Sequence, residues 1–213
     1  MIVSWKHVTR RVSISLSAVV LMVFLAACGG GGSTGSATPT PTSPASNPSP
    51  TTPSVAMQTF TGNGFTISYP QSWQKTSSNS QGLNQVAFHD ETTGNAFTIV
   101  MTPDPEGAAS ADKIADTSVQ TLSSVAVKNG KPATVPASTT INGITWSQRA
   151  ITGTVAVNSQ DVPAKVIVLV TIHPANSATS QAFELFYGGP TFTFDLVNTQ
   201  IFQPMLQSFK FTA

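Results

Sequence analysis

The stretch Gly64-Phe65-Thr66-Ile67-Ser68-Tyr69-Pro70 predicts the first structural unit of the folded body. Its three apolar residues alternate with polar ones, which places them on one face of a strand. Gly62-Asn63-Gly64 is a turn signal that joins this strand to a partner at residues 59–61 as a β-hairpin. Pro70 ends the strand, because proline has no backbone N–H to give to a sheet.

Further along the chain, apolar runs bounded by turn residues predict more strands. The most informative run is 166–170, five apolar residues without alternation, which is typical of a strand covered on both faces. Gly188-Gly189-Pro190 is predicted to break the last of these strands. The predicted strands cover residues 86–88, 97–101, 144–157, 165–172 and 182–187.

Two helices are predicted among these strands. Ser110 is a candidate N-cap for a helix over residues 111–127, where apolar residues recur at helical spacing, and Asn129-Gly130 is predicted to end it. A closing helix is predicted over residues 195–208, with a kink or break at Pro204. The pattern as a whole predicts an α+β domain, in which helices pack on the faces of an antiparallel sheet of six to eight strands.

The N-terminal segment has the layout of a secretory signal peptide. Lys6, Arg10 and Arg11 form a basic head, an apolar core runs over about residues 14–25, and small residues follow. This apolar core is shorter than the ~20 residues of a membrane span, so we expect residues 1–27 to be removed. The alternative is a signal-anchor helix that stays in the mature protein.

Leu25-Ala26-Ala27-Cys28, followed by Gly29, resembles the lipobox of bacterial lipoproteins. The resemblance implies that the Cys28 thiol receives a diacylglycerol and that the signal is cut just before it. Two or three acyl chains, at ~0.8 kcal/mol per buried CH₂, would hold the protein on the extracytoplasmic face of the cell membrane. The alternative is a small buried cysteine in an apolar run. Cys28 is the only cysteine, so no intramolecular disulfide is expected.

Residues 28–56 are predicted to be a disordered tether, and residues 57–213 the globular domain. The tether is built from Gly, Ser, Thr, Pro and Ala without a charge or an aromatic ring, so it cannot offset the entropy of ordering. Loss of residues 1–27 removes three of the ten basic residues and none of the nine acidic ones, which leaves a net charge of −2. The remaining basic residues are scattered, which argues against nucleic-acid binding.

Both ends of the predicted domain resemble those of PsbP-like domains, a family named after an extrinsic subunit of photosystem II. The matching stretches are Gly64-Phe-Thr-Ile-Ser-Tyr-Pro-Gln-Ser-Trp73 and Met205-Leu206-Gln207-Ser208-Phe209-Lys210-Phe211. The resemblance implies an α/β/α sandwich whose last helix runs into a short final strand. It does not carry over a photosynthetic role, because no residue of that role can be matched here.

Candidate catalytic and metal-binding residues are few. His89 precedes Asp90 and Glu91 at a predicted strand end, but one histidine and two acids fall short of a usual zinc site. His173 precedes Pro174 and is expected to be a surface loop residue.

Candidate calcium ligands and sugar-binding aromatic residues are also few. Asp104 and Glu106 could offer oxygens to calcium, but the usual calcium-loop pattern is missing. Trp73 and Trp146 could stack on a sugar, although packing in the core is the simpler interpretation. Without a nucleophile motif or a phosphate-binding loop, we expect no catalytic residue, metal or cofactor.

These observations favour a lipid-anchored binding or accessory module that is not an enzyme. We expect a monomer whose ligand is a protein, a glycan or a lipid. One alternative is a secreted hydrolase that brings His89, Glu91 and His173 within hydrogen-bond reach of each other. Another is a lipid carrier, which would need an apolar cavity of several hundred Å³.

Overall fold

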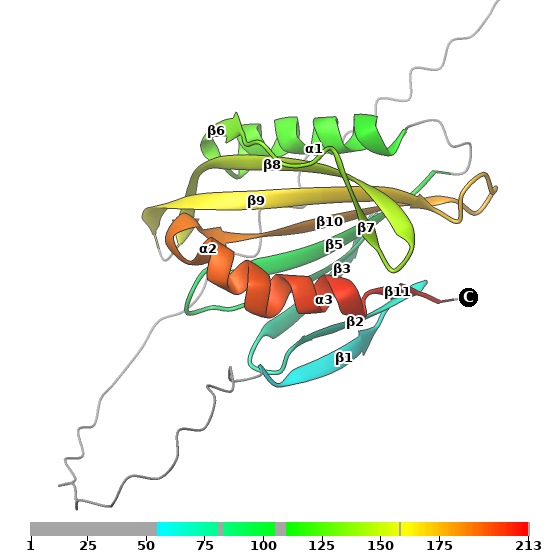
Figure 1. The fold of residues 1–213 in the computed structure, drawn as a ribbon, viewed down its shortest axis with the longest axis horizontal. Coiled ribbons are helices and arrows are strands. Elements are labelled where there is room, and N and C mark those ends of the chain that lie inside the picture. Colours follow the sequence, from blue (N-terminus) through cyan, green and yellow to red (C-terminus); the bar gives the residue numbers. More distant parts are fainter. Residues whose placement is uncertain (1–54, 81–82, 105–109, 158, 213) are drawn as a thin grey trace, which may run out of the picture.

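The strands form two antiparallel sheets in the computed structural model (Figure 1), which describes residues 55–80, 83–104, 110–157 and 159–212. The predicted signal peptide, Cys28, Glu106 and nearly all of the predicted tether lie outside the described residues. The large sheet has eight strands in the order β3-β4-β5-β10-β9-β8-β6, and β7 pairs with β8. The strands of this sheet are β3 (Gln74–Ser80), β4 (Leu83–His89), β5 (Ala96–Pro103), β6 (Lys128–Pro132), β7 (Ser138–Ile141), β8 (Ile144–Val157), β9 (Gln160–His173) and β10 (Gln181–Pro190).

The small sheet joins the beginning of the domain to its end. Its strands are β1 (Met57–Thr61), β2 (Phe65–Pro70) and β11 (Lys210–Phe211), with β2 in the middle. The predicted hairpin of β1 and β2 is confirmed, and the final strand lies beside it, with Phe211 opposite Phe65. The two stretches that resemble PsbP-like domains are therefore neighbours in space.

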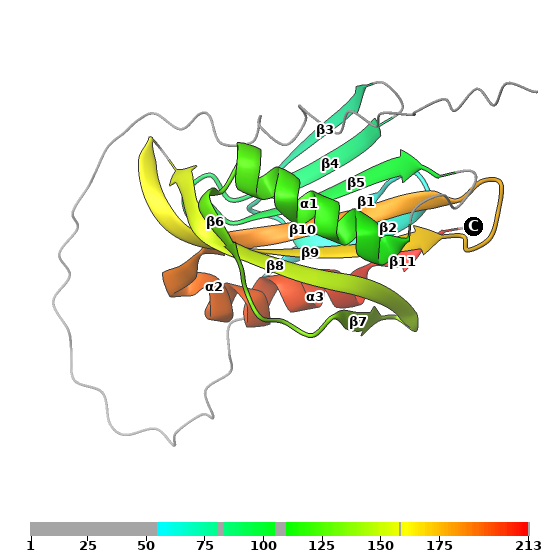
Figure 2. The same ribbon diagram turned by 90° about the horizontal axis from the view of Figure 1, so that it is seen from above.

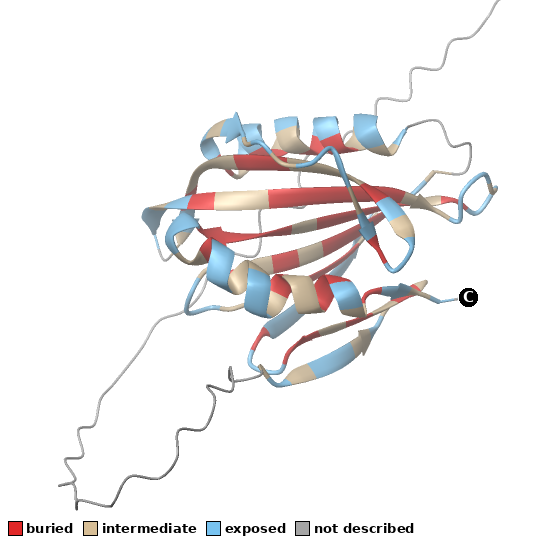
Figure 3. Ribbon diagram, in the orientation of Figure 1, coloured by how far each residue is buried: buried red, intermediate tan, exposed pale blue. Residues whose placement is uncertain are grey.

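Helices cover both faces of the large sheet, as predicted. α1 (Ala111–Val125) packs on β6, β8 and β9 on one face. The continuous helix made of α2 (Thr191–Val197), η2 (Asn198–Phe202) and α3 (Gln203–Ser208) lies on the opposite face, beside the small sheet (Figures 1 and 2). Central strands are buried on both faces as a result, and β9 is buried continuously from Ile167 to Thr171 (Figure 3).

The two faces have different cores. The face toward α2 and α3, called the aromatic face below, is filled by large rings that include Phe65, Phe97, Trp146 and Phe202. The face toward α1, called the α1 face below, is built mainly from aliphatic and small residues. Its buried members are Ala115, Leu122, Val127, Ile151, Val155, Ala164, Val168 and Val170.

The helix predictions are largely confirmed. The Ser110 side chain accepts a hydrogen bond from the Lys113 N–H at the start of α1. Asn129-Gly130 lies inside β6 instead of closing the helix, because α1 already ends at Val125. Near Pro204 the helix widens into the π-helical turn η2. The missing proline N–H and the bulk of its ring explain this widening, so the predicted disturbance is a π turn and not a break.

One predicted break is wrong. β10 continues through Gly188-Gly189-Pro190, and the closing helix begins at Thr191 and not at residue 195. The glycines are needed for close packing, because a side chain on Gly188 would collide with the Lys165 carbonyl and one on Gly189 with the Asn95 amide. Glycine here permits close approach within a strand instead of ending it.

Three strands had no signal in the sequence. Every residue of β3 is exposed, and its sequence Gln-Lys-Thr-Ser-Ser-Asn-Ser has no apolar alternation. β6 and β7 are short and largely exposed, and they follow the long strand β8 along its edge. Backbone pairing with a neighbour holds such strands, so their own side chains do not reveal them.

Candidate functional site

The two histidines lie at opposite ends of the large sheet. The position on β9 that is in register with His89 is Val166. The register runs from His89 through Ala96 on β5 and Gly188 on β10. His173 is seven residues further along β9, roughly 23 Å away at the rise of a strand. The hydrolase site of His89, Glu91 and His173 is therefore not assembled.

Local contacts explain the ionisable groups near these histidines. His173 stacks on Phe211 with ring centroids 3.8 Å apart, and burial lowers its pKa. Asp90 is partly buried, which raises its pKa, but hydrogen bonds from Thr92 and Thr93 outweigh burial and leave the pKa below its usual range. Among the described residues, no three His, Cys, Asp or Glu side chains gather as a metal site would require.

Both candidate tryptophans belong to the core of the aromatic face. Trp146 is fully buried and packs edge-on against Phe209, with ring centroids 5.5 Å apart. Trp73 is also buried and meets Phe202 edge-on. Neither ring is available to stack on a sugar, so the core interpretation is confirmed.

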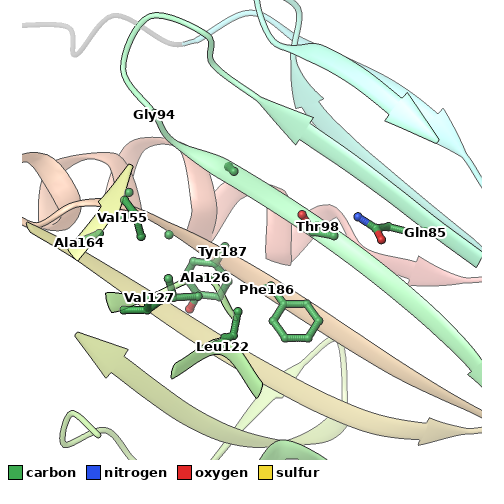
Figure 4. Close-up of a pocket in the computed structure, with 14 residues that line it drawn as sticks. Gln85, Gly94, Thr98, Leu122, Ala126, Val127, Val155, Ala164, Phe186 and Tyr187 are labelled. Atoms are coloured by element: carbon green, nitrogen blue, oxygen red, sulfur yellow. The ribbon is translucent and has the colours of Figure 1, made fainter. Parts of the chain in front are cut away.

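The most distinctive cavity lies on the α1 face, between the end of α1 and strands β4, β5, β8, β9 and β10 (Figure 4). We call it the apolar hollow. Its cavity volume is about 80 Å³, and the space between its walls reaches about 660 Å³ only when the open solvent at its mouth is counted. Its walls are Gln85, Gly94, Ala96, Thr98, Leu122, Ala126, Val127, Val155, Ala164, Val166, Phe186, Tyr187, Gly188 and Gly189.

Small residues explain why this space is empty. Ala96, Ala126 and Ala164 line the hollow, and so do the glycine pair of β10 and Gly94. Leu122 on α1 and Phe186 on β10 form its apolar sides (Figure 4). The hollow is therefore a consequence of side-chain size on the α1 face, where alanine and glycine leave open the space beside the Phe186 ring.

A buried hydrogen bond fastens α1 beside the hollow. Glu184 on β10 is 2% exposed, and its carboxyl accepts a hydrogen bond from the Ser118 hydroxyl on α1 at 2.5 Å. Burial raises the pKa of Glu184, and the hydrogen bond from Ser118 offsets only part of this effect. Away from the hollow, Arg149 on β8 pairs with Asp116 and Asp112 on α1, at 2.6 and 3.2 Å.

The hollow has one polar end. Gln85 is 8% exposed, and Figure 4 shows its amide directed along the sheet toward Thr98. No hydrogen-bond partner for the buried Gln85 Oε1 is found among the described residues. Tyr187 also lines the hollow, but its ring packs on Phe97 and Phe202 on the opposite face. The side chains that can offer polar groups inside are therefore those of Gln85 and Thr98.

A second cavity, the amide cleft, opens on the aromatic face and has a volume of about 400 Å³, or about 1000 Å³ when the open solvent at its mouth is counted. Neutral polar groups dominate its rim, and Lys165 and Asp195 contribute one charge of each sign. The Lys165 ammonium lies 4.8 Å from the centroid of the Phe194 ring, and burial raises the pKa of Tyr187 to about 12. The amide side chains of the cleft belong to Asn142, Gln148, Asn198, Gln203 and Gln207.

Sequence reasoning missed the residues that matter most for the hollow. Glu184 stood out only as an acid within an apolar strand, and Gln85 lay just outside the predicted strand 86–88. The single available signal was the conflict between the charge of Glu184 and its apolar neighbours, because a buried acid needs a partner. Ser118, that partner, looked like an ordinary helix residue.

Comparison with solved structures finds chains of similar fold, and LpqN is among them. No protein-family model matches this chain, and no curated protein matches it in sequence. Its fold is similar to the crystal structure of LpqN, described as involved in cell envelope biogenesis of Mycobacterium tuberculosis, with a TM-score of 0.46 and 10% identity over 74% of this chain and 91% of that chain. A likeness at this level carries no argument about function. The PsbP-like resemblance stays a prediction.

Proposed function

We propose that this chain is a lipid-anchored, extracytoplasmic binding protein of the PsbP-like type, without catalytic activity of its own. Cys28 carries the anchor, and the apolar hollow on the α1 face takes the ligand. The lipobox-like stretch and the basic-apolar layout of residues 1–27 support the anchor. Within the described ranges, every helix is too short or too polar to cross a bilayer.

The hollow is the single observation that carries the ligand assignment. Its lining is almost entirely aliphatic, glycine or alanine, which suits an apolar ligand and offers little to a charged one. Burial of about eight methylene groups would supply about 6 kcal/mol before the costs of association. Affinity would then be moderate, as expected of a carrier that must also release its ligand.

Binding of a neutral fluorescent probe, N-phenyl-1-naphthylamine, tests the ligand site. The measurement uses the full chain with Cys28→Ser, so that the protein's own acyl chains do not compete. We expect Ala96→Phe and Ala126→Phe, which add rings to partly buried walls, to weaken probe binding at least tenfold. Ala178→Phe, in an exposed loop at the other end of β9, is the matched control and should bind like the parent. Equal binding by all four proteins would refute the assignment.

The anchor has its own test. Cys28→Ser should remove the acyl chains and release the protein from membranes or leave its precursor uncut, as seen by fractionation and by intact-protein mass spectrometry. Met22→Ser, a change of an apolar signal residue outside the lipobox, controls for general damage to export. A Cys28→Ser protein that is still cut at the same position and still membrane-bound would contradict the lipoprotein assignment.

The amide cleft favours a second candidate function, binding of a neutral glycan. Amide side chains pair well with sugar hydroxyls, and Gln148 and Gln207 make no side-chain hydrogen bonds to the rest of the described chain. Calorimetry with soluble N-acetylglucosamine oligomers tests this candidate. Heat that is lost in the double variant Gln148→Leu, Gln207→Leu supports glycan binding, and no heat with the parent protein refutes it for this sugar.

A further inference from the structure

We propose that the apolar hollow selects ligands by their head group, and that it takes single-chain amphiphiles with a neutral hydroxyl or amide head held by Gln85. This inference rests on the proposed function and makes it more specific. The tail would lie across the sheet toward Val155, and the head would give its proton to Gln85 Oε1.

The first support is a buried acceptor that no described residue satisfies. Gln85 Oε1 is enclosed and without a hydrogen-bond partner, while Val100, directly opposite Gln85 on β5, is apolar and buried. Buried polar groups are nearly always paired, so an unpaired one directed into a cavity points to a partner that enters from outside. Figure 4 shows the Gln85 side chain beside Thr98, with its amide nitrogen on the side of Thr98.

The second support is the length of the hollow. Gln85 lies on β4 and Val155 on β8, and the strand order β4-β5-β10-β9-β8 places four inter-strand spacings between them. A lining that runs over five neighbouring strands suits an extended aliphatic chain better than a compact ring. The polar groups occupy one end, because Thr98 is on β5 beside β4.

The third support concerns charge. Among the described residues, no lysine, arginine or histidine lines the hollow, so a carboxylate head would meet no cationic partner from them. Glu184 lies two strands from Gln85, because Val100 is opposite both residues. The Glu184 carboxyl is a buried acid on this face, and it accepts a hydrogen bond from Ser118. A second acid would be desolvated close to the first, which disfavours fatty acids and favours neutral heads.

Displacement of N-phenyl-1-naphthylamine by three ten-carbon ligands tests the inference on the full chain with Cys28→Ser. We expect 1-decanol to displace the probe at concentrations at least tenfold lower than decyl methyl ether, which has the same oxygen but no proton to donate. Decanoate at pH 8 should be weaker than decanol by at least the same factor. Gln85→Leu should abolish the preference for decanol over the ether while it retains probe binding, and Gln58→Leu, at an exposed position on β1 of the small sheet, should leave the preference unchanged.

Each outcome decides a different point. Equal displacement by decanol and ether, with probe binding intact, overturns head-group selection and leaves the hollow as a site for apolar ligands. A preference that survives in Gln85→Leu assigns the head to another group and also overturns the inference. Absence of probe binding in the parent refutes the proposed function itself. If Gln85→Leu unfolds, Gln85→Met is measured in its place, with circular dichroism as the check on folding.

Discussion

The two faces of the large sheet are packed in opposite ways. On the aromatic face, rings such as Phe97, Tyr187 and Phe202 stack or tilt against one another in a dense core beside the amide cleft. On the α1 face, valine, alanine and glycine meet a helix of small residues and leave a hollow. Tight packing provides most of the stability of a domain, whereas a space that is not filled is available for a ligand. The comparison assigns stability to one face and binding to the other.

The largest expected effect is on the aromatic face. Phe202 contacts four rings, those of Trp73, Phe97, Tyr187 and Phe194. Phe202→Ala should lower the free energy of unfolding by about 3–5 kcal/mol, because it leaves a large cavity among rings that cannot collapse. Urea denaturation followed by tryptophan fluorescence measures the change. A loss below about 1 kcal/mol would contradict the assignment of stability to this face.

A smaller loss is expected from the matching change on the α1 face. Leu122 is buried beneath α1 and borders the hollow. Leu122→Ala should cost about 2–3 kcal/mol, at the low end for a buried leucine, because part of its surroundings is already empty. The same denaturation assay compares the two variants, and a loss equal to that of Phe202→Ala would remove the difference between the faces.

A pH effect should separate the faces further. The pKa of Glu184 is higher in the folded protein than in the unfolded chain, so the folded state binds more protons. Its contribution to stability is therefore full below the unfolded pKa of about 4.5 and is lost as pH rises through the raised folded pKa. Glu184→Gln should flatten the decline of unfolding free energy over this range. Unfolding curves at a series of pH values above 4 test the prediction, and an unchanged slope in the variant would exclude Glu184 as its source.

The smallest effect is expected at the rim of the α1 face. The side chain of Arg149 is 27% exposed, but those of its partners Asp112 and Asp116 are 67% and 56% exposed. Arg149→Met retains the aliphatic stem and should cost no more than about 1 kcal/mol, with a difference that shrinks in 1 M salt. Lys128→Met, which breaks the exposed pair with Asp161, is the control. A larger, salt-independent loss would show that Arg149 stabilises through packing.

The parts of the fold that could be predicted are those where apolar patterning and local structure agree. β2 has clear alternation, β8 has a long apolar pattern, and α1 begins after a capping serine. The structure contains all three elements. β3 could not be predicted, because its residues are exposed and it is held by backbone pairing with β4. The glycines of β10 were misread, because close approach of Asn95 and Lys165 depends on tertiary packing.

The candidate site was less predictable than the fold. An apolar cavity was considered as the mark of a lipid carrier, but its place could not be derived from the sequence. It depends on small residues that meet from the end of α1, the loop before β5, and strands β5, β9 and β10, and each of them is unremarkable where it stands in the chain. The histidines attracted attention because of their chemistry, and the sheet places them at opposite ends.

The pairing of β2 with β11 sets the order in which this domain can be completed. Strand β2 emerges early in synthesis, yet its second edge waits for residues 210 and 211, and the Ser68 N–H waits for the hydroxyl of Ser208, 140 positions later. Contacts between residues so far apart in sequence form slowly, because the chain loses the entropy of the long loop before the contact stabilises it. The domain of a nascent chain therefore stays incomplete until residues 208–211 are released, and loss of these residues would leave the middle strand of the small sheet with an open edge.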